Sequence, residues 1–331
     1  MREISLAPII LFLYNRLKHT QDTIEALRKN DLAQQSDLYV FCDGPKKNAN
    51  QDQIEKVLEV QSYADSIAGF KHVYVKKQPV NKGLANSVIS GVSEVIEKYG
   101  KAIVVEDDII THPFFLRFMN GALSFYEKDK RIFTIGGMMD KIDIPNSYKK
   151  DVLLSHRVES WGWATWADRW FTVEWDILKY SIWGKNQKKE IKQLCRGGDD
   201  LWGMLQMQNL NKTDSWAVRW QYNMSKQNKY CLRPVCSFVS NVGFDGSGVH
   251  CGTSETGTEK ALTTALYNKT KYEIKLEEYL TENADINDAY MRLFAVHKDP
   301  LIVRLKVFVF NMFLILKNKL KLISFLHISK I

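Results

Sequence analysis

The chain has 331 residues, enough for two domains or for one large α/β domain with an extension. Hydrophobic residues make up 45% and charged residues 25%, which excludes global disorder, collagen and a coiled coil. The formal net charge is +8, but six positive charges follow Asp299, where no acid occurs, so the rest of the chain is nearly neutral. This distribution argues against a nucleic-acid partner and favours an anionic membrane surface as the partner of the tail.

Neither the N-terminus nor the cysteines indicate secretion. The apolar run at residues 7–14 is short and leads into Asn15-Arg16 rather than a small-residue cleavage site. No uninterrupted stretch of about 20 apolar residues occurs, so no transmembrane helix is predicted. The five cysteines include no CxxC pair, and the spacing of Cys231, Cys236 and Cys251 fits no usual zinc pattern. We therefore expect reduced thiols and a cytoplasmic protein, peripheral at the inner face of the cell membrane.

Strand and helix patterns alternate over the first 137 residues. Buried-strand patterns predict strands at 7–14, 37–42, 72–75, 102–105 and 132–135. Amphipathic patterns with caps and stops predict helices at 18–28, 51–67, from Gly83 to Tyr99, and from Pro113 to Glu127. The alternation predicts a doubly wound, mainly parallel sheet flanked by helices, an α/β fold.

The pattern changes near residue 150. All nine tryptophans lie between Trp161 and Trp220, and residues 243–258 are rich in Gly, Ser and Thr, which predicts a mobile loop. A helix is predicted at 275–290. The tail at 300–331 alternates apolar runs with lysines, and its segment 307–316 is too short to span a bilayer but suits an interfacial helix.

Three carboxylates follow the strand at 102–105 directly: Glu106, Asp107 and Asp108. In open α/β sheets, ligands bind beyond the carboxyl ends of the strands. Adjacent carboxylates repel one another and need a cation or strong donors nearby, and hard oxygen ligands suit Mg²⁺ or Mn²⁺. The alternative is a helix cap at Asp108 with solvated surface acids.

Polar residues follow two other strands as well. Asp43 ends the second strand within an Asp-Gly turn, and Asn15-Arg16 follow the first. Their convergence at one sheet edge indicates a nucleotide-diphosphate site, although for Asp43 a plain turn is the alternative. No GxGxxG follows the first strand and no GxxxxGK[ST] occurs, so dinucleotide and P-loop sites are excluded.

The order of these motifs resembles that of a GT-A-fold glycosyltransferase, similar to bacterial relatives of N-acetylglucosaminyltransferase I and to family 2 glycosyltransferases. The matching segments are PIILFLYNR, the Asp43 turn, NKGLANS, VVEDD, SWGWATW, SWAVRW and RPVCSFVSNVGFDGSGVH. The resemblance implies an inverting transferase that uses a nucleotide-diphospho-sugar donor and Mn²⁺ or Mg²⁺.

The resemblance also implies roles for individual residues. Asp43 would contact the nucleotide base, Asp108 would ligate the metal, and His250 would lie near the diphosphate or metal on a closing loop. Glu106 and Asp107 would hold donor hydroxyls or metal-bound waters. The other donor-site residues are expected in two groups: Asn15, Arg16 and Lys82 beside the donor, and Trp161, Gly162 and Trp163 beside the donor sugar and acceptor.

The catalytic base is the point at which the chain departs from the family pattern. The family carries an acid between two tryptophans, but none lies between Trp216 and Trp220 here. The candidates are Asp214, Asp245, Glu159 and Asp200. Asp214 is favoured because it directly precedes the SWAVRW segment, and its alternative role is that of a helix N-cap. The tryptophans themselves are either a stacking platform for sugars or a structural core.

Together these features predict three parts: a nucleotide-sugar-binding half at 1–150, a Trp-rich acceptor-binding and catalytic half at 151–298, and a basic amphipathic tail at 299–331. The expected reaction is sugar transfer to a glycan or lipid-linked oligosaccharide in bacterial surface polysaccharide synthesis. Two alternatives stay open. One is a sugar-phosphate nucleotidyltransferase, which would want a Gly-rich loop after the first strand, and the other is a non-catalytic, membrane-associated glycan-binding protein.

Overall fold

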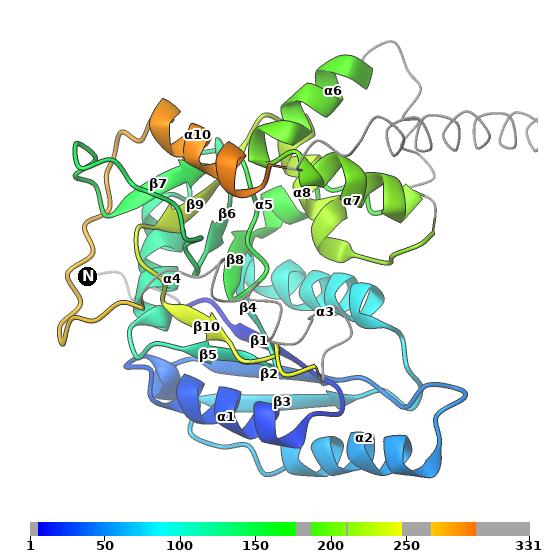
Figure 1. Ribbon diagram of the computed structural model, residues 1–331. Helices are drawn as coiled ribbons and strands as arrows, with labels where there is room; N and C mark the ends of the chain where they lie inside the picture. Colours follow the sequence, from blue (N-terminus) through cyan, green and yellow to red (C-terminus); the bar gives the residue numbers. More distant parts are fainter. Residues whose placement is uncertain (1–5, 177–186, 210, 247–265, 296–331) are drawn as a thin grey trace, which may run out of the picture. The chain divides into compact units, whose positions relative to one another are not determined.

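The computed structural model describes residues 6–176, 187–209, 211–246 and 266–295. The described residues up to Phe294 form one unit, whose elements are labelled in Figure 1. His250 and the tail from residue 296 lie outside the described residues, as does most of the predicted loop at 243–258. Within the described part, no helix is long and apolar enough to cross a membrane.

An eight-stranded sheet forms the centre of the unit, in the order β3-β2-β1-β4-β8-β6-β9-β7. Its first half is parallel, whereas β8 pairs antiparallel with both β4 and β6, and β7 pairs antiparallel with β9. The sheet is therefore mixed but mostly parallel, and it continues across residue 150. The strands are β1 (Ile9–Leu13), β2 (Asp37–Cys42), β3 (His72–Lys77), β4 (Lys101–Glu106), β6 (Ile132–Gly136), β7 (Val152–Ser155), β8 (Trp163–Trp166) and β9 (Tyr230–Pro234).

Helices cover both faces of this sheet, as the doubly wound prediction requires (Figure 1). A separate two-stranded ribbon pairs β5 (Ile109–Thr111) antiparallel with β10 (Val239–Asn241). The helices are α1 (Leu17–Arg28), α2 (Gln51–Ala64), α3 (Leu84–Tyr99), α4 (Phe115–Phe125), α5 (Ala167–Trp170), α6 (Gln187–Leu194), α7 (Asp200–Asn209), α8 (Trp216–Lys226) and α10 (Ala284–Leu293).

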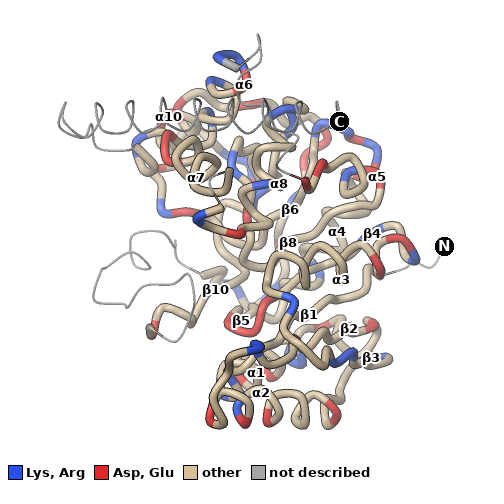
Figure 2. The backbone as a smooth tube through the Cα atoms, turned by 90° about the vertical axis from the view of Figure 1, so that its right-hand side faces the viewer, with Lys and Arg blue, Asp and Glu red and all other residues tan. Residues whose placement is uncertain are grey.

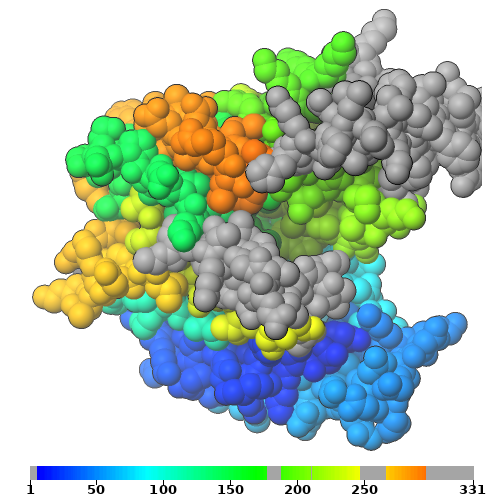
Figure 3. All heavy atoms as spheres, in the orientation of Figure 1, coloured from blue at the N-terminus to red at the C-terminus, as the bar shows by residue number. Residues whose placement is uncertain are grey.

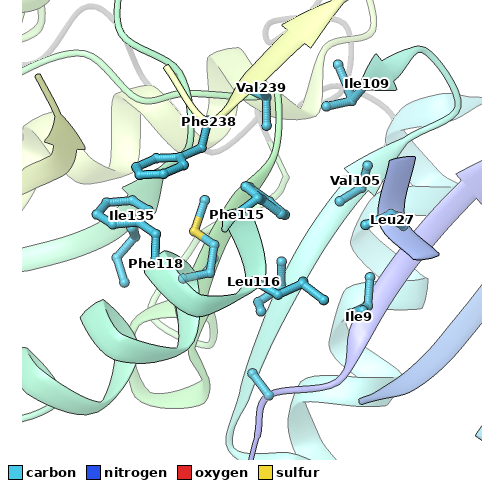
Figure 4. Close-up of a cluster of buried hydrophobic side chains, with 14 of the residues drawn as sticks. Ile9, Leu27, Val105, Ile109, Phe115, Leu116, Phe118, Ile135, Phe238 and Val239 are labelled. Carbon is cyan, nitrogen blue, oxygen red and sulfur yellow. The ribbon is translucent and has the colours of Figure 1, made fainter. Parts of the chain in front are cut away.

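Alternate residues of β1 pack on opposite faces of the sheet. Ile9 and Leu11 join the core beneath α1, α2 and α4, part of which is drawn in Figure 4. Ile10 and Phe12 join a second core beneath α3 and α8. Because both faces are covered, β1 is buried at every position, which explains its continuous apolar sequence.

The tryptophan-rich segment forms part of this second core. Trp163 is fully buried and stacks on Trp216, with 5.0 Å between ring centroids. Trp170 and Trp220 are fully buried beside it, at 5.8 Å from Trp163. Of the two roles left open by the sequence, these tryptophans therefore have the structural one.

The helix predicted at 275–290 is wrong in its first half. Residues 275–283 are not helical, because their backbone amides bond to side chains of the body: Lys275 N donates to Asp151 Oδ2 at 2.8 Å, and Glu277 N donates to the Tyr126 hydroxyl at 3.1 Å. Helix α10 begins only after Asn283, whose side chain accepts from Ile286 N.

Candidate functional site

A cavity of about 330 Å³ opens at the carboxyl ends of the parallel strands β1, β2 and β4. Its volume lies in the range of small-molecule sites, and its wall combines aromatic rings with several charged groups. The lining residues are Phe12, Leu13, Tyr14, Asn15, Arg16, Phe41, Cys42, Asp43, Lys46, Gln78, Asn81, Lys82, Gly83, Leu84, Ser87, Ser90, Glu106, Asp107, Asp108 and Asp214. The cavity thus contains the motif residues expected after the first, second and fourth strands.

Arg16 pairs with two of the three consecutive carboxylates. Its Nη2 donates to Asp107 Oδ1 and to Asp108 Oδ2, the latter at 2.9 Å, and its Nε lies 3.3 Å from Asp107 Oδ2. Burial alone lowers the pKa of Arg16, but the charges of Asp107 and Asp108 outweigh it and raise this pKa. In Figure 2, acidic positions in red lie close to basic positions in blue near the labels β5 and β1.

The pKa of Glu106, the third carboxylate, is raised, as is that of its neighbour Asp107, and burial is the main cause for both. Burial raises the pKa of Glu106 to about 8, with further contributions from the charges of Asp108 and Asp107, while Arg16 and a side-chain hydrogen bond with Trp216 oppose the shift. The raised pKa means that Glu106 takes up a proton more readily than an exposed glutamate does. Its bond to Trp216 fixes the start of α8 against the end of β4.

Asp43 holds the turn that leads into α3. Its Oδ1 accepts from Gly44 N at 2.9 Å and from Lys82 N at 2.8 Å, and its Oδ2 accepts from Gly83 N at 3.1 Å. The Asp-Gly turn is thus present. The same carboxylate also orders the NKG segment at residues 81–83, because it accepts from the amide of Lys82, which lies 39 residues further along the chain. Lys82 lies on this ordered segment at the cavity wall.

Two polar atoms at the cavity have no partner within the described part of the chain. Arg16 Nη1 and Ser87 Oγ are both buried and make no hydrogen bond there. Buried polar groups are nearly always hydrogen-bonded, so unpaired ones at a cavity wall indicate groups that meet a ligand. Ser87 lies in the first turns of α3, whose N-terminus carries a partial positive charge that favours an anion.

The segment after β10 lies close against Asp108. Val242 N donates to Asp108 O at 2.9 Å, and a Cβ added to Gly243 would come within 2.3 Å of Asp108 Oδ2, so this close approach requires glycine. Asp245 Oδ2 lies 3.2 Å from His19 Nε2 on α1. In Figure 3 this segment, in yellow, borders the blue N-terminal part.

The four candidate bases occupy different places. Asp214 lines the cavity and pairs with Arg219. Asp245 lies beside His19, and Asp200 is held by Arg157 with two hydrogen bonds of 2.9 and 2.8 Å. Asp214 is not the N-cap of α8, because Ser215 has that role and accepts from Val218 N at 3.3 Å. Of the four candidates, Asp214 is therefore the one that lines the same cavity as Asp107 and Asp108.

Glu159, the fourth candidate, belongs to a buried charge network. Its Oε2 lies 3.1 Å from Nη1 of the fully buried Arg233, which also pairs with Asp140. Its Oε1 accepts from Ser160 N at 2.8 Å and Trp161 N at 2.9 Å. These contacts make Glu159 a group that shapes the loop before β8, and it does not line the cavity.

The burial of Glu159 predicts a pH-dependent stability. Burial raises its pKa to about 7 from an ordinary 4.5, with Arg233 opposing and Asp140 adding to the shift. The folded chain thus binds a proton that the unfolded chain releases, so this stabilisation is present below pH 4.5 and is lost as the pH rises to about 7. In thermal denaturation at pH values from 4.5 to 8, the melting temperature of the wild type should fall relative to that of Glu159→Gln as the pH rises. Melting temperatures that depend on pH in the same way in both proteins would contradict this prediction.

The SWGW residues predicted to border the donor sugar are not among the residues that line the cavity. Trp163 is wholly buried, and its ring is enclosed by other tryptophans. The prediction that Trp163 borders the donor sugar is therefore corrected, because no part of its ring is exposed. Gly162 is buried with a φ of +67°, which favours glycine, against Phe115 and Val239. Trp161 is partly buried and contacts Phe244 edge-on at 5.5 Å.

The carboxylates of the cavity fit a divalent cation only together with a ligand. No group of three or more His, Cys, Asp or Glu side chains in the described ranges is placed to hold a metal. Mg²⁺ and related ions, however, need only one or two carboxylates when substrate phosphates and water complete the shell. Asp107 and Asp108 supply such oxygens, so the residues fit a cation that arrives with a diphosphate.

Sequence reasoning missed several residues of the cavity wall. Lys46 and Gln78 come from the loops after β2 and β3, and Asn81, Gly83 and Ser87 belong to the NKGLANS motif. The motif itself was a signal for the last three, since it opens a helix at the edge where the strands end. Nothing local marks Lys46 or Gln78, which reach the cavity through the parallel pairing of β2 and β3.

No protein-family model and no curated protein matches the chain. Among solved structures, it is similar to the mannosyltransferase PcManGT from Pyrobaculum calidifontis in complex with GDP-Man and Mn²⁺, with 8% identity over 68% of this chain and 70% of that chain, at a TM-score of 0.33. It is also similar to S. aureus TarS, with 11% identity, 72% and 37% coverage and a TM-score of 0.38.

A UDP-glucose pyrophosphorylase complexed with UDP-glucose is similar as well, with 9% identity over 69% of this chain and 90% of that chain, at a TM-score of 0.31. TM-scores this low do not place the chain in a fold family. The structures that the chain resembles thus include a mannosyltransferase and a nucleotide-sugar pyrophosphorylase.

Proposed function

We propose that the chain is a metal-dependent, inverting glycosyltransferase that moves a sugar from a nucleotide-diphospho-sugar to a hydroxyl group of a glycan. The observation that carries this proposal is the cavity at the carboxyl ends of the parallel strands. It joins a carboxylate pair, an unpaired arginine nitrogen and a helix N-terminus to an apolar wall. A nucleoside diphosphate has matching parts, because its base and ribose offer flat apolar faces and its phosphates are anions.

The cationic residues of the cavity are the proposed diphosphate-binding groups. Arg16, Lys46 and Lys82 all line it. Asp43 fixes the backbone that carries Lys82, and the remaining lone pairs of its carboxylate are the acceptors we propose for the base. Asn15 is proposed to lie beside the donor, while Phe12, Tyr14 and Phe41 supply the apolar wall.

Asp214 is the proposed general base. It would accept the proton of the acceptor hydroxyl as that oxygen bonds to the anomeric carbon, while the bond from this carbon to the diphosphate oxygen breaks. The products are a glycoside of inverted configuration and a nucleoside diphosphate. A bound Mn²⁺ or Mg²⁺ ion, held by Asp108, would supply positive charge to the leaving diphosphate. Asp107 and Glu106 are proposed to orient donor hydroxyls.

The finer parts of the proposal rest on the sequence. The acceptor is proposed to be a glycan or lipid-linked oligosaccharide of a bacterial surface polysaccharide, and residues 299–331 to bind an anionic membrane. His250 stays a predicted ligand of the diphosphate or metal. A nucleotidyltransferase is expected to have a Gly-rich loop after the first strand. Residues 14–20 contain no glycine, and this favours the glycosyltransferase.

The purified full chain should release a nucleoside diphosphate from at least one nucleotide sugar of a panel when Mn²⁺ or Mg²⁺ is present, and should release more when an acceptor glycan is added. Chromatography of the nucleotides distinguishes the alternatives. Nucleoside triphosphate formed from nucleotide sugar and pyrophosphate would replace the proposal with a nucleotidyltransferase. Glycan binding without any nucleotide binding or turnover would indicate a non-catalytic protein.

A further inference from the structure

The guanidinium group of Arg16 occupies the place where a cation would meet Asp107 and Asp108. It contacts both carboxylates, and its side chain is 15% exposed while each aspartate side chain is 7% exposed. A divalent ion that approaches these oxygens therefore meets a site whose charge is already compensated. Two positive groups on the same carboxylate pair would repel each other, so one of them has to move.

The surroundings of Arg16 show where its guanidinium has an unmet interaction. Nη1 is buried without a partner among the described residues, although Nη2 and Nε are engaged. The same side chain lines the cavity, beside Asn15. A diphosphate in this cavity would offer acceptors to Nη1 that the carboxylates do not, because arginine binds phosphate with paired hydrogen bonds.

From this geometry we propose that Arg16 is a displaceable internal counter-ion that couples metal binding to donor binding. Before ligands bind, it holds Asp107 and Asp108 together, and it moves to the diphosphate when a divalent cation and a nucleoside diphosphate arrive together. The inference rests on the proposed function and adds its regulation. The chain then binds the metal weakly by itself and the metal–nucleotide complex much more tightly.

The first experiment measures binding of Mn²⁺ alone by electron paramagnetic resonance, without nucleotide. Arg16→Gln should bind Mn²⁺ at least tenfold more tightly than the wild type, because the competing cation is gone. Lys82→Gln is the matched control, since it removes one positive charge from the same cavity without a contact to Asp107 or Asp108. Its Mn²⁺ affinity should change less than threefold. Equal affinities of Arg16→Gln and the wild type overturn the proposal.

The second part measures coupling. In the wild type, UDP or GDP should strengthen Mn²⁺ binding by a factor that falls at least tenfold in Arg16→Gln, while Arg16→Lys, which keeps the charge, lies between them. An unchanged factor overturns the proposal. If the wild type binds no nucleoside diphosphate with metal, across the nucleotides of the panel, the proposed function fails, and the comparison with Mn²⁺ alone still decides whether Arg16 competes with the ion.

A measurement on the wild type covers the case in which Arg16→Gln does not fold, since that variant leaves two buried carboxylates without a counter-charge. The Nε–H of Arg16 is held near Asp107 Oδ2, at 3.3 Å, and gives an NMR signal that is assigned by its loss in Arg16→Lys. Adding diamagnetic Mg²⁺ with UDP or GDP should shift this signal. A signal that stays in place while the nucleotide binds overturns the displacement.

Discussion

Replacing Asp108 by asparagine should lower sugar transfer by at least about 10²–10³-fold while the protein remains folded. The variant keeps the size of the side chain but removes the charge that is proposed to hold the metal, and groups that stabilise developing charge contribute on this scale. The amide oxygen of the new side chain would still accept a hydrogen bond from Arg16, whose Nη2 lies 2.9 Å from Oδ2 of Asp108. Turnover of the donor identified by the panel, with a thermal melt, measures both properties.

The matched variant for this experiment is Asp214→Asn, which changes a second acid of the same cavity. Because Asp214 is the proposed base, Asp214→Asn should transfer sugar about 10²–10⁴-fold more slowly than the wild type and should still bind the nucleotide with metal. Asp108→Asn, by contrast, should lose both sugar transfer and the binding of the nucleotide with metal. Full activity of the wild type in EDTA, or normal turnover by Asp108→Asn, would reject the metal assignment, and near-native transfer by Asp214→Asn would reject the base.

Trp163→Ala should lower the free energy of unfolding by about 3–5 kcal/mol, the usual cost of removing a large buried aromatic ring. Trp163 has no exposed surface and contacts Trp170, Trp216 and Trp220, so the cavity left behind has rigid walls. Chemical denaturation of the full chain measures this change.

Trp161→Ala is the control for the tryptophan cluster, because Trp161 lies two residues away but is only partly buried. Its stability loss should be clearly smaller than that of Trp163→Ala. If Trp163→Ala instead kept its stability and lost donor binding, Trp163 would be a sugar-stacking residue, and the core assignment would be wrong.

Much of the N-terminal fold could be predicted from local patterns. Gly100 ends α3 in the left-handed conformation that glycine favours, and the continuous apolar run of β1 reflects burial on both faces. The position of β8 could not be predicted in this way. Its four residues are all buried, so they show no alternation, and its insertion between β4 and β6 depends on pairings between residues 27 to 65 positions apart in the chain.

The candidate site was predictable in its residue types but not in their partners. The end of a parallel strand marks Arg16, Asp43 and Asp108 as site residues. That Arg16 bonds to Asp107 across 91 residues, and that the Asp43 oxygens accept from the amides of Lys82 and Gly83, follows only from tertiary structure. The helix predicted at 275–290 was wrong in its first half for the same reason. There, side chains from distant parts of the chain accept hydrogen bonds from the backbone amides of Lys275 and Glu277.

The position of β8 has a consequence for how the chain is made. During synthesis β4 and β6 leave the ribosome before β8, and β6 gains its other neighbour, β9, only after residue 230. Strands β1 to β4 can pair as soon as they appear, but one edge of β4 stays open until Trp163–Trp166 arrives. An open apolar edge invites pairing with other chains, so the nascent protein is exposed to aggregation through this edge during the interval.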